Sequence, residues 1–331
     1  MNNTILQINH LKTYFFTRNG VVKAVDDISI ELRKGESLCM VGESGCGKTA
    51  TALSILGLID SPPGKIVSGE ILYHGEDLLH YSSERLRHLR GNRIAMIFQD
   101  PQSSLNPVLT VGDQIAEQIK VHLGLNHKQS TERATHLMEQ VGIPRASERI
   151  GDYPHQFSGG MKQRVMIAAA LSCDPEIIIA DEPTTALDTT IKVQILDVFQ
   201  ELKQQREMSL LFITHDLGTV AGIADRIVVM YGGKIAEVGT TLDIFDRPKH
   251  PYTHGLIDCL PDISARKDRL TPIPGMIPSL IDPPEGCVFH PRCQHRMPIC
   301  DKEIPEEIVI STEHSVACHL YSRSNQLKRT L

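Results

Sequence analysis

The feature that most constrains the fold is a glycine-rich octapeptide between an apolar run and a helical pattern. Residues 42–49 read Gly-Glu-Ser-Gly-Cys-Gly-Lys-Thr, which fits G-x-x-x-x-G-K-[ST]. The apolar run Ser37–Val41 precedes it, and a helical pattern carrying Leu53 and Leu56 follows it. Glycines let the backbone wrap with its N–H groups inward, and a helix N-terminus adds positive potential. A strand, a phosphate-binding loop and a helix are therefore predicted in that order.

The octapeptide also predicts which residues contact a nucleoside triphosphate. Its backbone would hold the α- and β-phosphates, Lys48 would reach the β- and γ-phosphates, and the Thr49 hydroxyl would ligate Mg²⁺. A glycine-rich turn with a surface lysine is the alternative, and the strand and helix on either side argue against it. The residues expected to contact nucleotide here are Gly42, Ser44, Gly45, Cys46, Gly47, Lys48, Thr49 and Ala50.

Length, composition and charge exclude several classes of protein. With 331 residues, 41% of them hydrophobic and 22% charged, the chain is typical of one large globular domain plus an appended module. A net charge of −6 argues against nucleic acid as a main partner. Apolar runs such as residues 165–173 fall short of the roughly 20 residues that cross a bilayer. Because the N-terminus also lacks a secretion signal, we expect a cytoplasmic protein whose membrane role is peripheral.

Residues 1–245 alternate short apolar runs with longer helical patterns, which predicts an α/β fold with a largely parallel sheet. Val111, Ile115 and Ile119 recur at helical spacing and predict an inserted helical subdomain at about residues 103–165. The predicted strands are residues 28–32, 37–41, 71–73, 94–98, 177–180, 210–213 and 227–230.

Two further motifs suggest phosphate chemistry. The apolar run 177–180 ends in Asp181 and Glu182, so the first carboxylate could hold hydrated Mg²⁺ and the second could polarise water as a general base. Residues 157–161, Phe-Ser-Gly-Gly-Met, form a second glycine turn before a helix, which is an anion site by geometry. Taken alone, the first could be a solvated acidic strand end and the second an ordinary helix cap. Since the chain already has one phosphate loop, a second anion loop suggests a γ-phosphate supplied from elsewhere.

In this order the motifs resemble those of the nucleotide-binding subunit of an ABC transporter, which implies a P-loop NTPase fold of the ABC type. Residues 42–49 match the Walker A motif of that family, and residues 177–181 match its Walker B motif. The remaining matches are Gln99 for the Q-loop, Ser158-Gly159-Gly160 for the signature, Glu182 for the catalytic glutamate, Ala186-Leu187-Asp188 for the D-loop and His215 for the switch histidine.

The resemblance implies a head-to-tail dimer in which each ATP lies between one Walker A motif and the opposite signature. Ser158 and Gly160 would then serve the nucleotide of the partner.

His215 would contact the γ-phosphate, and Gln99 would sense it, help to hold Mg²⁺ and touch the membrane partner. Phe15 best matches the aromatic residue that stacks on adenine, with Tyr14 or Phe16 as alternatives. One departure is that the signature is flanked by Phe157 and Met161, where the family usually has leucine and glutamine.

Frequent prolines after about residue 245 predict a separate C-terminal module, residues 246–331, of irregular structure. His250-Pro251-Tyr252-Thr253 and the proline-rich stretch after it resemble the C-terminal region of subunits that drive dipeptide and oligopeptide uptake. This resemblance implies a second ATP-binding subunit, related or identical, two permease subunits and an external binding protein. Other small cargo, such as a nickel chelate or glutathione, and a soluble ABC ATPase without a permease remain the alternatives.

Four cysteines lie in this module at spacing C-x5-C-x6-C-x17-C: Cys287, Cys293, Cys300 and Cys318. Four thiols in a short segment with little apolar content argue for a bound metal, and the tight pairs of structural zinc sites are absent. Together with the resemblance, this favours a [4Fe–4S] cluster. Zinc, with His290, His295 or His319 as substitute ligands, and free thiols are the alternatives. Cys39, Cys46, Cys173 and Cys259 are expected to be structural.

Overall fold

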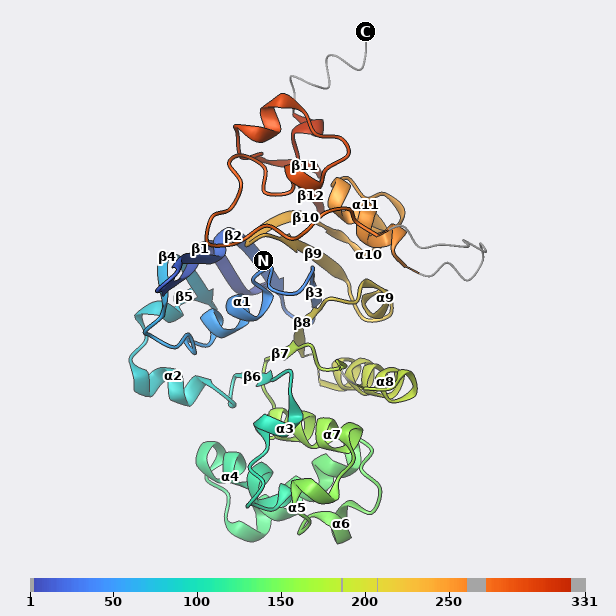
Figure 1. Ribbon diagram of the computed structural model, residues 1–331. Coiled ribbons are helices and arrows are strands. Elements are labelled where there is room, and N and C mark those ends of the chain that lie inside the picture. Colours follow the sequence, from blue (N-terminus) through green and yellow to red (C-terminus); the bar gives the residue numbers. More distant parts are fainter. Residues whose placement is uncertain (1–2, 186, 207, 261–271, 323–331) are drawn as a thin grey trace. The chain divides into compact units, whose positions relative to one another are not determined.

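The computed structural model describes residues 3–185, 187–206, 208–260 and 272–322. These residues form two compact units (Figure 1). One, here called the helical unit, contains residues 32–36 and 80–213, and the other, the P-loop unit, contains residues 4–31, 37–79 and the part of the chain after residue 213. The domain boundary expected near residue 245 stays a prediction.

The helical unit is built on three parallel strands in the order β8-β7-β6. They are β6 (Ile94–Ile97), β7 (Ile177–Asp181) and β8 (Ser209–Thr214). Every residue of β7 and β8 is buried, as expected for parallel strands covered on both faces. This confirms the three strands that the continuous apolar runs predicted in this part of the chain.

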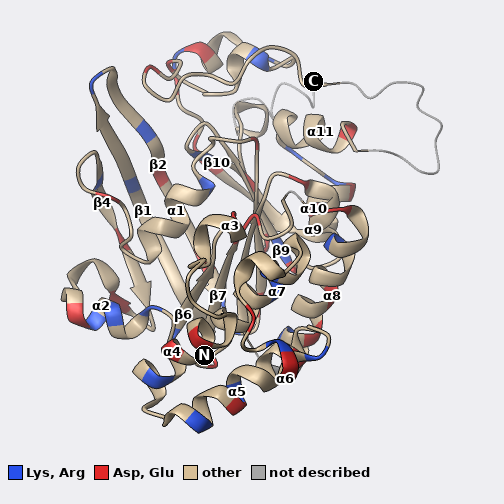
Figure 2. Ribbon diagram, turned by 60° about the horizontal axis from the view of Figure 1, so that its bottom comes forward, with Lys and Arg blue, Asp and Glu red and all other residues tan. Residues whose placement is uncertain are grey.

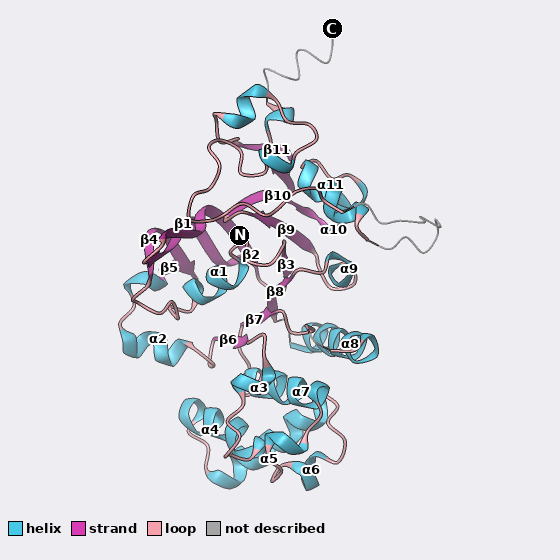
Figure 3. Cartoon of the chain, in the orientation of Figure 1, coloured by secondary structure: helices cyan, strands magenta, loops and turns pink. Residues whose placement is uncertain are grey.

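Between β6 and β7 the chain is helical, as Figure 3 shows. The helices there are α3 (Pro101–Ser104), α4 (Val111–Leu123), α5 (His127–Gln140), α6 (Ala146–Arg149), a 3-10 turn at Pro154–Gln156, and α7 (Gly159–Ala170). Thr110 caps α4, and Asn126 forms a capping box with Gln129 at the start of α5. Basic and acidic residues alternate along α5, which Figure 2 marks by blue and red on the ribbon. α2 (Ser83–Leu89) and α8 (Thr189–Arg206) complete the unit.

The P-loop unit contains an antiparallel sheet in the order β2-β1-β4-β5. Its strands are β1 (Thr4–Thr17), β2 (Gly20–Arg33), β4 (Gly64–Tyr73) and β5 (Glu76–Asp77). The expectation of a largely parallel sheet did not include it, and β1 was not among the predicted strands. A register shift between Asn9 and Lys12 interrupts the period-two pattern that would have marked β1.

A second set of strands in the P-loop unit has the order β11-β12-β10-β9-β3. β3 (Ser37–Val41) and β9 (Arg226–Tyr231) are parallel and fully buried, and both were predicted. β9 and β10 (Lys234–Thr240) form a hairpin through Gly232 and Gly233, which both have positive φ. β11 (Glu307–Ser311) and β12 (His314–Ala317) extend this sheet, although an irregular module was predicted.

The other elements of the P-loop unit are short. They are α1 (Lys48–Ile55), α9 (Leu217–Val220), α10 (Thr241–Asp246), α11 (Pro251–Asp258) and 3-10 turns at His290–Arg292, Pro298–Asp301 and His319–Tyr321, with a further 3-10 turn, Leu78–His80, where the chain passes between the units. Within the described ranges, no helix combines the length and the apolar character that crossing a bilayer requires.

Candidate functional site

The phosphate-binding loop lies between β3 and α1, as predicted. Gly47 is the N-cap of α1 with φ of 109°, a conformation that side chains disfavour. A Cβ there would collide with the carbonyl oxygen of Ala24, and one on Gly42 would collide with the carbonyl oxygen of Met230. The loop therefore packs so closely on its own unit that glycine is required at both positions.

Lys48 is held inside this loop. Its side chain is buried, and Nζ donates hydrogen bonds to the carbonyl oxygens of Gly42 at 2.7 Å and Glu43 at 3.1 Å. Nζ also lies 3.7 Å from Cys46 Sγ. Burial raises the pKa of the Cys46 thiol although Lys48 acts in the opposite direction, so Cys46 remains a neutral packing residue. The ammonium of Lys48 is thus positioned by backbone carbonyls of the loop itself.

The three aromatic residues considered for adenine lie at the end of β1. The Tyr14 hydroxyl donates to Asp26 at 2.6 Å, which fixes that ring. Phe15 is half-buried and pairs in register with Gly64, whereas Phe16 is 51% exposed. Of the three side chains, Phe16 is therefore the most accessible, and the choice of Phe15 stays a prediction.

In the helical unit, Asp181 and Glu182 end the buried strand β7, and both are themselves buried. The Glu182 carboxylate accepts hydrogen bonds from Gln99 Nε2 at 3.0 Å and Thr185 Oγ1 at 2.9 Å. The φ of Glu182 is +48°, an uncommon value for a residue with a side chain. The structure thus brings Gln99 and Glu182 together, and it adds Thr185, which the sequence motifs did not indicate.

The signature serine begins α7. Ser158 is the N-cap, and its hydroxyl accepts a hydrogen bond from the Met161 N–H at 3.3 Å. A Cβ on Gly160 would collide with the Ile191 side chain, and the N–H of Ile191 donates to the Asp188 carboxylate at 3.0 Å. The signature and Asp188 therefore meet at the start of α8. Ala186 lies outside the described residues.

The two unusual residues beside the signature share a partner. The Arg149 guanidinium lies over the Phe157 ring, 4.9 Å from its centroid, and Arg149 Nη1 donates to the Met161 sulfur at 3.4 Å. Arg149 is also paired with Asp152 at 3.3 Å. Phe157 is buried, so the aromatic ring and the thioether form a packed support for this turn.

The predicted nucleotide residues divide between the units. His215 follows β8, is exposed, and belongs to the P-loop unit with Phe15, residues 42–49 and Ala50. The helical unit holds the other predicted contacts, namely Gln99, Ser158, Gly159, Gly160, Asp181, Glu182 and Asp188. Each unit therefore carries part of the predicted chemistry.

The four cysteines of the C-terminal module lie in residues 286–322, here called the cysteine segment. Cys287, Cys300 and Cys318 are buried, Cys293 is half-buried, and the Cys287 N–H donates to the Cys300 carbonyl at 2.9 Å. The pKa of Cys287 is raised to about 11 and that of Cys318 to about 12, mainly by burial and to a smaller extent by the neighbouring cysteines. Three of these four thiols are thus withdrawn from solvent within one short segment of the chain.

The surroundings of these sulfurs partly fit a metal group. Backbone N–H groups of Phe289 and His290 hydrogen-bond to the Cys287 sulfur, as the N–H of Leu320 does to that of Cys318, and such bonds stabilise thiolates. In the part of the chain that the structure describes, however, no three cysteine, histidine or acidic side chains are arranged to hold a metal ion. The donor set therefore fits by number and by environment, but the sulfurs do not adopt a ligand geometry.

The histidines considered as zinc ligands have other contacts or are exposed. Nδ1 of His290 lies 3.0 Å from the Cys287 carbonyl oxygen, and Nε2 of His319 lies 2.8 Å from the Glu303 carbonyl oxygen. His295 is exposed. In two of the three histidines, one ring nitrogen is thus within hydrogen-bond distance of a backbone carbonyl oxygen.

Glu43 of the phosphate-binding loop has partners that the motifs did not indicate. Its carboxylate accepts hydrogen bonds from Nη1 and Nη2 of Arg292, at 2.6 and 3.1 Å. Its N–H donates a hydrogen bond to the Tyr252 hydroxyl at 2.9 Å. The only sequence signal was the segment 250–253, singled out as a family marker. His250 of that segment caps α11 by accepting from the Tyr252 N–H.

Comparison with known proteins gives two family matches. Residues 25–185 match the ABC transporter family, and residues 236–300 match the oligopeptide/dipeptide transporter C-terminal region. Among solved structures, a dimeric post-hydrolysis state of the ATP-binding cassette MJ0796 bound to ADP and Pi is 24% identical with a TM-score of 0.64, covering 71% of this chain and 98% of that chain. That likeness shows the fold.

Curated relatives match along nearly the whole chain. The dipeptide transport ATP-binding protein DppD of Bacillus subtilis is 48% identical over 316 residues, covering 96% of this chain and 94% of the relative. The protein of the same name from Escherichia coli is 45% identical over 315 residues, covering 95% and 96%. The chain therefore belongs to the ATP-hydrolysing subunits of the ABC transporter family, in the branch that carries the oligopeptide/dipeptide transporter C-terminal region.

Proposed function

We propose that this chain is the ATP-binding subunit that drives import of dipeptides or oligopeptides. The observation that carries the proposal is the match of residues 236–300 to the oligopeptide/dipeptide transporter C-terminal region, in a chain 48% identical to a dipeptide transport ATP-binding protein. The chain would act at the cytoplasmic face of the membrane, bound to two permease subunits that receive peptide from an external binding protein.

The proposed nucleotide site uses residues from several of the motifs that this chain shares with the family. Residues 42–50 would hold the phosphates, with Lys48 at the β- and γ-phosphates, and Phe15 would stack on adenine. Glu182 would orient the attacking water, and His215 would contact the γ-phosphate. The contact between Gln99 and Glu182 supports this assignment, because it places a polar donor on the carboxylate proposed as the base.

Thr49, Gln99 and Asp181 are the residues that would hold Mg²⁺, which neutralises phosphate charge when bound. Asp181 fits this role by its chemistry and place, since it is a carboxylate at the end of the buried strand β7. Hydroxyl, amide and carboxylate oxygens are also the hard ligands that Mg²⁺ prefers.

A second ATP-binding subunit would complete the site with its own signature. We propose that Ser158, Gly159 and Gly160 of this chain serve the nucleotide of that partner, with Asp188 next to them. Ser158 caps a twelve-residue helix, α7, so its turn offers the N–H groups and the positive potential that a γ-phosphate requires. The partner is proposed to be a related subunit rather than a copy of this chain.

For the cysteine segment we propose a [4Fe–4S] cluster bound by Cys287, Cys293, Cys300 and Cys318, with zinc as the second candidate. Four cysteines in one short segment, three of them buried, with backbone N–H groups on the sulfurs of Cys287 and Cys318, support a thiolate-bound group. Iron and sulfide analysis of anaerobically purified protein tests this, and stoichiometric zinc without iron would replace the cluster. Free thiols with neither metal would remove the proposal.

Transport itself is tested in proteoliposomes that contain this chain, its partner subunit and the permease subunits. We expect ATP-dependent uptake of peptides that requires the external binding protein. Uptake of a nickel chelate or of glutathione without peptide uptake would correct the cargo. ATP hydrolysis that never depends on permease or binding protein would contradict the transport function.

A further inference from the structure

The guanidinium of Arg292 connects the cysteine segment to the phosphate-binding loop. Its side chain is 4% exposed, and Nη1 and Nη2 each donate to one oxygen of Glu43. Nη1 also donates to the Tyr231 hydroxyl at 3.2 Å, while Nε donates to the Pro274 carbonyl at 2.9 Å. Nη2 reaches the Ile273 carbonyl at 3.4 Å, so all five donors have acceptors. Such a fully used planar fork fixes the position of its partner.

Glu43, which Arg292 holds in place, in turn contacts Lys48. Its side chain is held by Arg292, its N–H by the Tyr252 hydroxyl, and its carbonyl oxygen accepts a hydrogen bond from Lys48 Nζ at 3.1 Å. Three independent groups of one residue are therefore anchored. Because Glu43 is fixed at both its backbone and its carboxylate, the ammonium of Lys48 is placed by contacts that begin in the cysteine segment.

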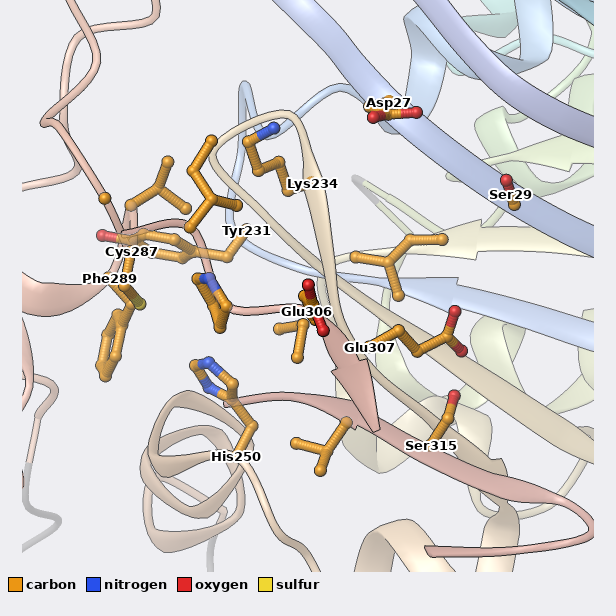
Figure 4. Close-up of a pocket in the computed structure, with 18 of the residues that line it drawn as sticks. Asp27, Ser29, Tyr231, Lys234, His250, Cys287, Phe289, Glu306, Glu307 and Ser315 are labelled. Carbon is orange, nitrogen blue, oxygen red and sulfur yellow. The ribbon is translucent and has the colours of Figure 1, made fainter. Parts of the chain in front are cut away.

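Aromatic packing strengthens the same connection. The ring of Phe289 lies 5.1 Å from Tyr231 and 5.4 Å from Tyr252, and Tyr231 lies 4.6 Å from Tyr252. Figure 4 shows Tyr231 and Phe289 beside Cys287 at the wall of a cavity of about 500 Å³. The aromatic group of Tyr231, Tyr252 and Phe289 therefore packs beside the Arg292 fork, and Tyr231 takes part in both.

We propose that Arg292 is a positioning residue for the nucleotide site: through Glu43 it holds the phosphate-binding loop and Lys48 in place. The cysteine segment is then a structural part of that site. Arg292 immediately precedes Cys293. A change of backbone conformation at this cysteine would therefore move the residue that contacts the loop. This inference rests on the proposed nucleotide role of residues 42–49.

The test measures equilibrium affinity for MgATP in the full chain carrying R292M, E43Q or both. We expect each single variant to weaken MgATP binding about tenfold, within the usual range of coupling between sites, and the double variant to be no weaker than either. In the assembled transporter the KM for ATP should rise while kcat stays near that of the wild type, because Arg292 touches no reacting atom. Binding by R292M within twofold of the wild type would overturn the proposal.

Arg296 supplies a matched control. It also forms a two-bond fork, through Nε and Nη2, with Asp301 in the same segment, but its side chain is 51% exposed and its carboxylate partner lies outside the phosphate-binding loop. R296M should therefore bind MgATP like the wild type. An equal loss of affinity in R296M and R292M would show a general effect of the segment and would overturn the specific route through Glu43.

Two further variants keep the outcome decisive. If R292M does not fold, Y252F removes only the hydroxyl that accepts the Glu43 N–H and should still weaken MgATP binding, whereas unchanged affinity would overturn the proposal. K48A distinguishes the positioning role of Arg292 from the nucleotide role of residues 42–49. Loss of binding in K48A with normal binding in R292M refutes the positioning role alone, while a wild-type chain that never binds MgATP refutes the nucleotide site itself.

Discussion

Gln99 Nε2 donates a hydrogen bond of 3.0 Å to the Glu182 carboxylate, so the Q-loop residue and the proposed base are in direct contact. The same carboxylate oxygen accepts from Thr185 Oγ1 at 2.9 Å. Two donors on one oxygen hold the carboxylate in a single orientation at the end of β7. A ligand that drew Gln99 away would therefore also change the surroundings of Glu182, which would link the proposed sensing role of Gln99 to the proposed hydrolytic role of Glu182.

Replacing Glu182 with glutamine should stop hydrolysis and spare binding. The amide keeps the size of the side chain but cannot accept a proton, so kcat for ATP should fall by about 10²–10⁴-fold, the usual contribution of a general base. MgATP affinity should stay close to that of the wild type, because the phosphates are proposed to be held by residues 42–50. Steady-state phosphate release and equilibrium binding check both parts. Turnover at the original rate would refute Glu182 as the base.

Ser158 offers a test of the proposed partner contact. S158A removes the hydroxyl at the start of α7 and should abolish ATP-dependent association with the second subunit, while MgATP binding to the isolated chain is retained. The lost cap should lower stability by about 1 kcal/mol. T110A, which removes the cap of α4 in the same unit, is the control for that loss. Sedimentation in the presence of MgATP distinguishes the variants, and association of S158A equal to that of T110A would refute the role of the signature.

His250 predicts a pH dependence of stability. Burial, with a smaller contribution from His254, lowers the pKa of His250 from 6.5 to about 3, so the ring is neutral in the folded chain. The unfolded chain takes up the proton below 6.5, and the stability from this group is therefore complete above that pH and decreases as the pH falls toward 3. Between about pH 7.5 and 5.5 this linkage should lower the free energy of unfolding by about 1 kcal/mol.

Urea unfolding of H250N checks this prediction. Asparagine can accept the Tyr252 N–H as the helix cap but does not titrate in this range, so the variant should be less sensitive to acid than the wild type. All other titrating groups are common to both proteins. Parallel losses of stability in the two proteins on acidification would show that His250 makes no contribution.

The sequence was most informative where the structure depends on local pattern. β3, β7, β8 and β9 are apolar apart from residues at their ends because both of their faces are buried, and all four were predicted. β1 was not, since a register shift after Asn9 breaks its alternation. β11 and β12 are short and lie among prolines and turns, so only the pairing of β12 with β10, and of β11 with β12, marks them as strands.

The candidate site follows the same rule. The phosphate-binding loop is a local motif of eight consecutive residues, 42–49. Its place between a strand and a helix could therefore be predicted from the sequence alone. The contact between Gln99 and Glu182 spans 83 positions, and that between Arg292 and Glu43 spans 249. No spacing rule connects such residues, because tertiary packing brings them together. The role of Glu43 therefore became visible only in the structure.

We propose above all that residues 42–49 bind the triphosphate. Equilibrium binding of ATP to the purified chain, measured with and without Mg²⁺ for the wild type and K48A, tests this most directly. The account predicts magnesium-dependent binding by the wild type and a large loss in K48A, since its buried ammonium is the only side-chain cation within residues 42–49. Wild-type protein without magnesium-dependent affinity, or K48A that binds as tightly, would contradict it.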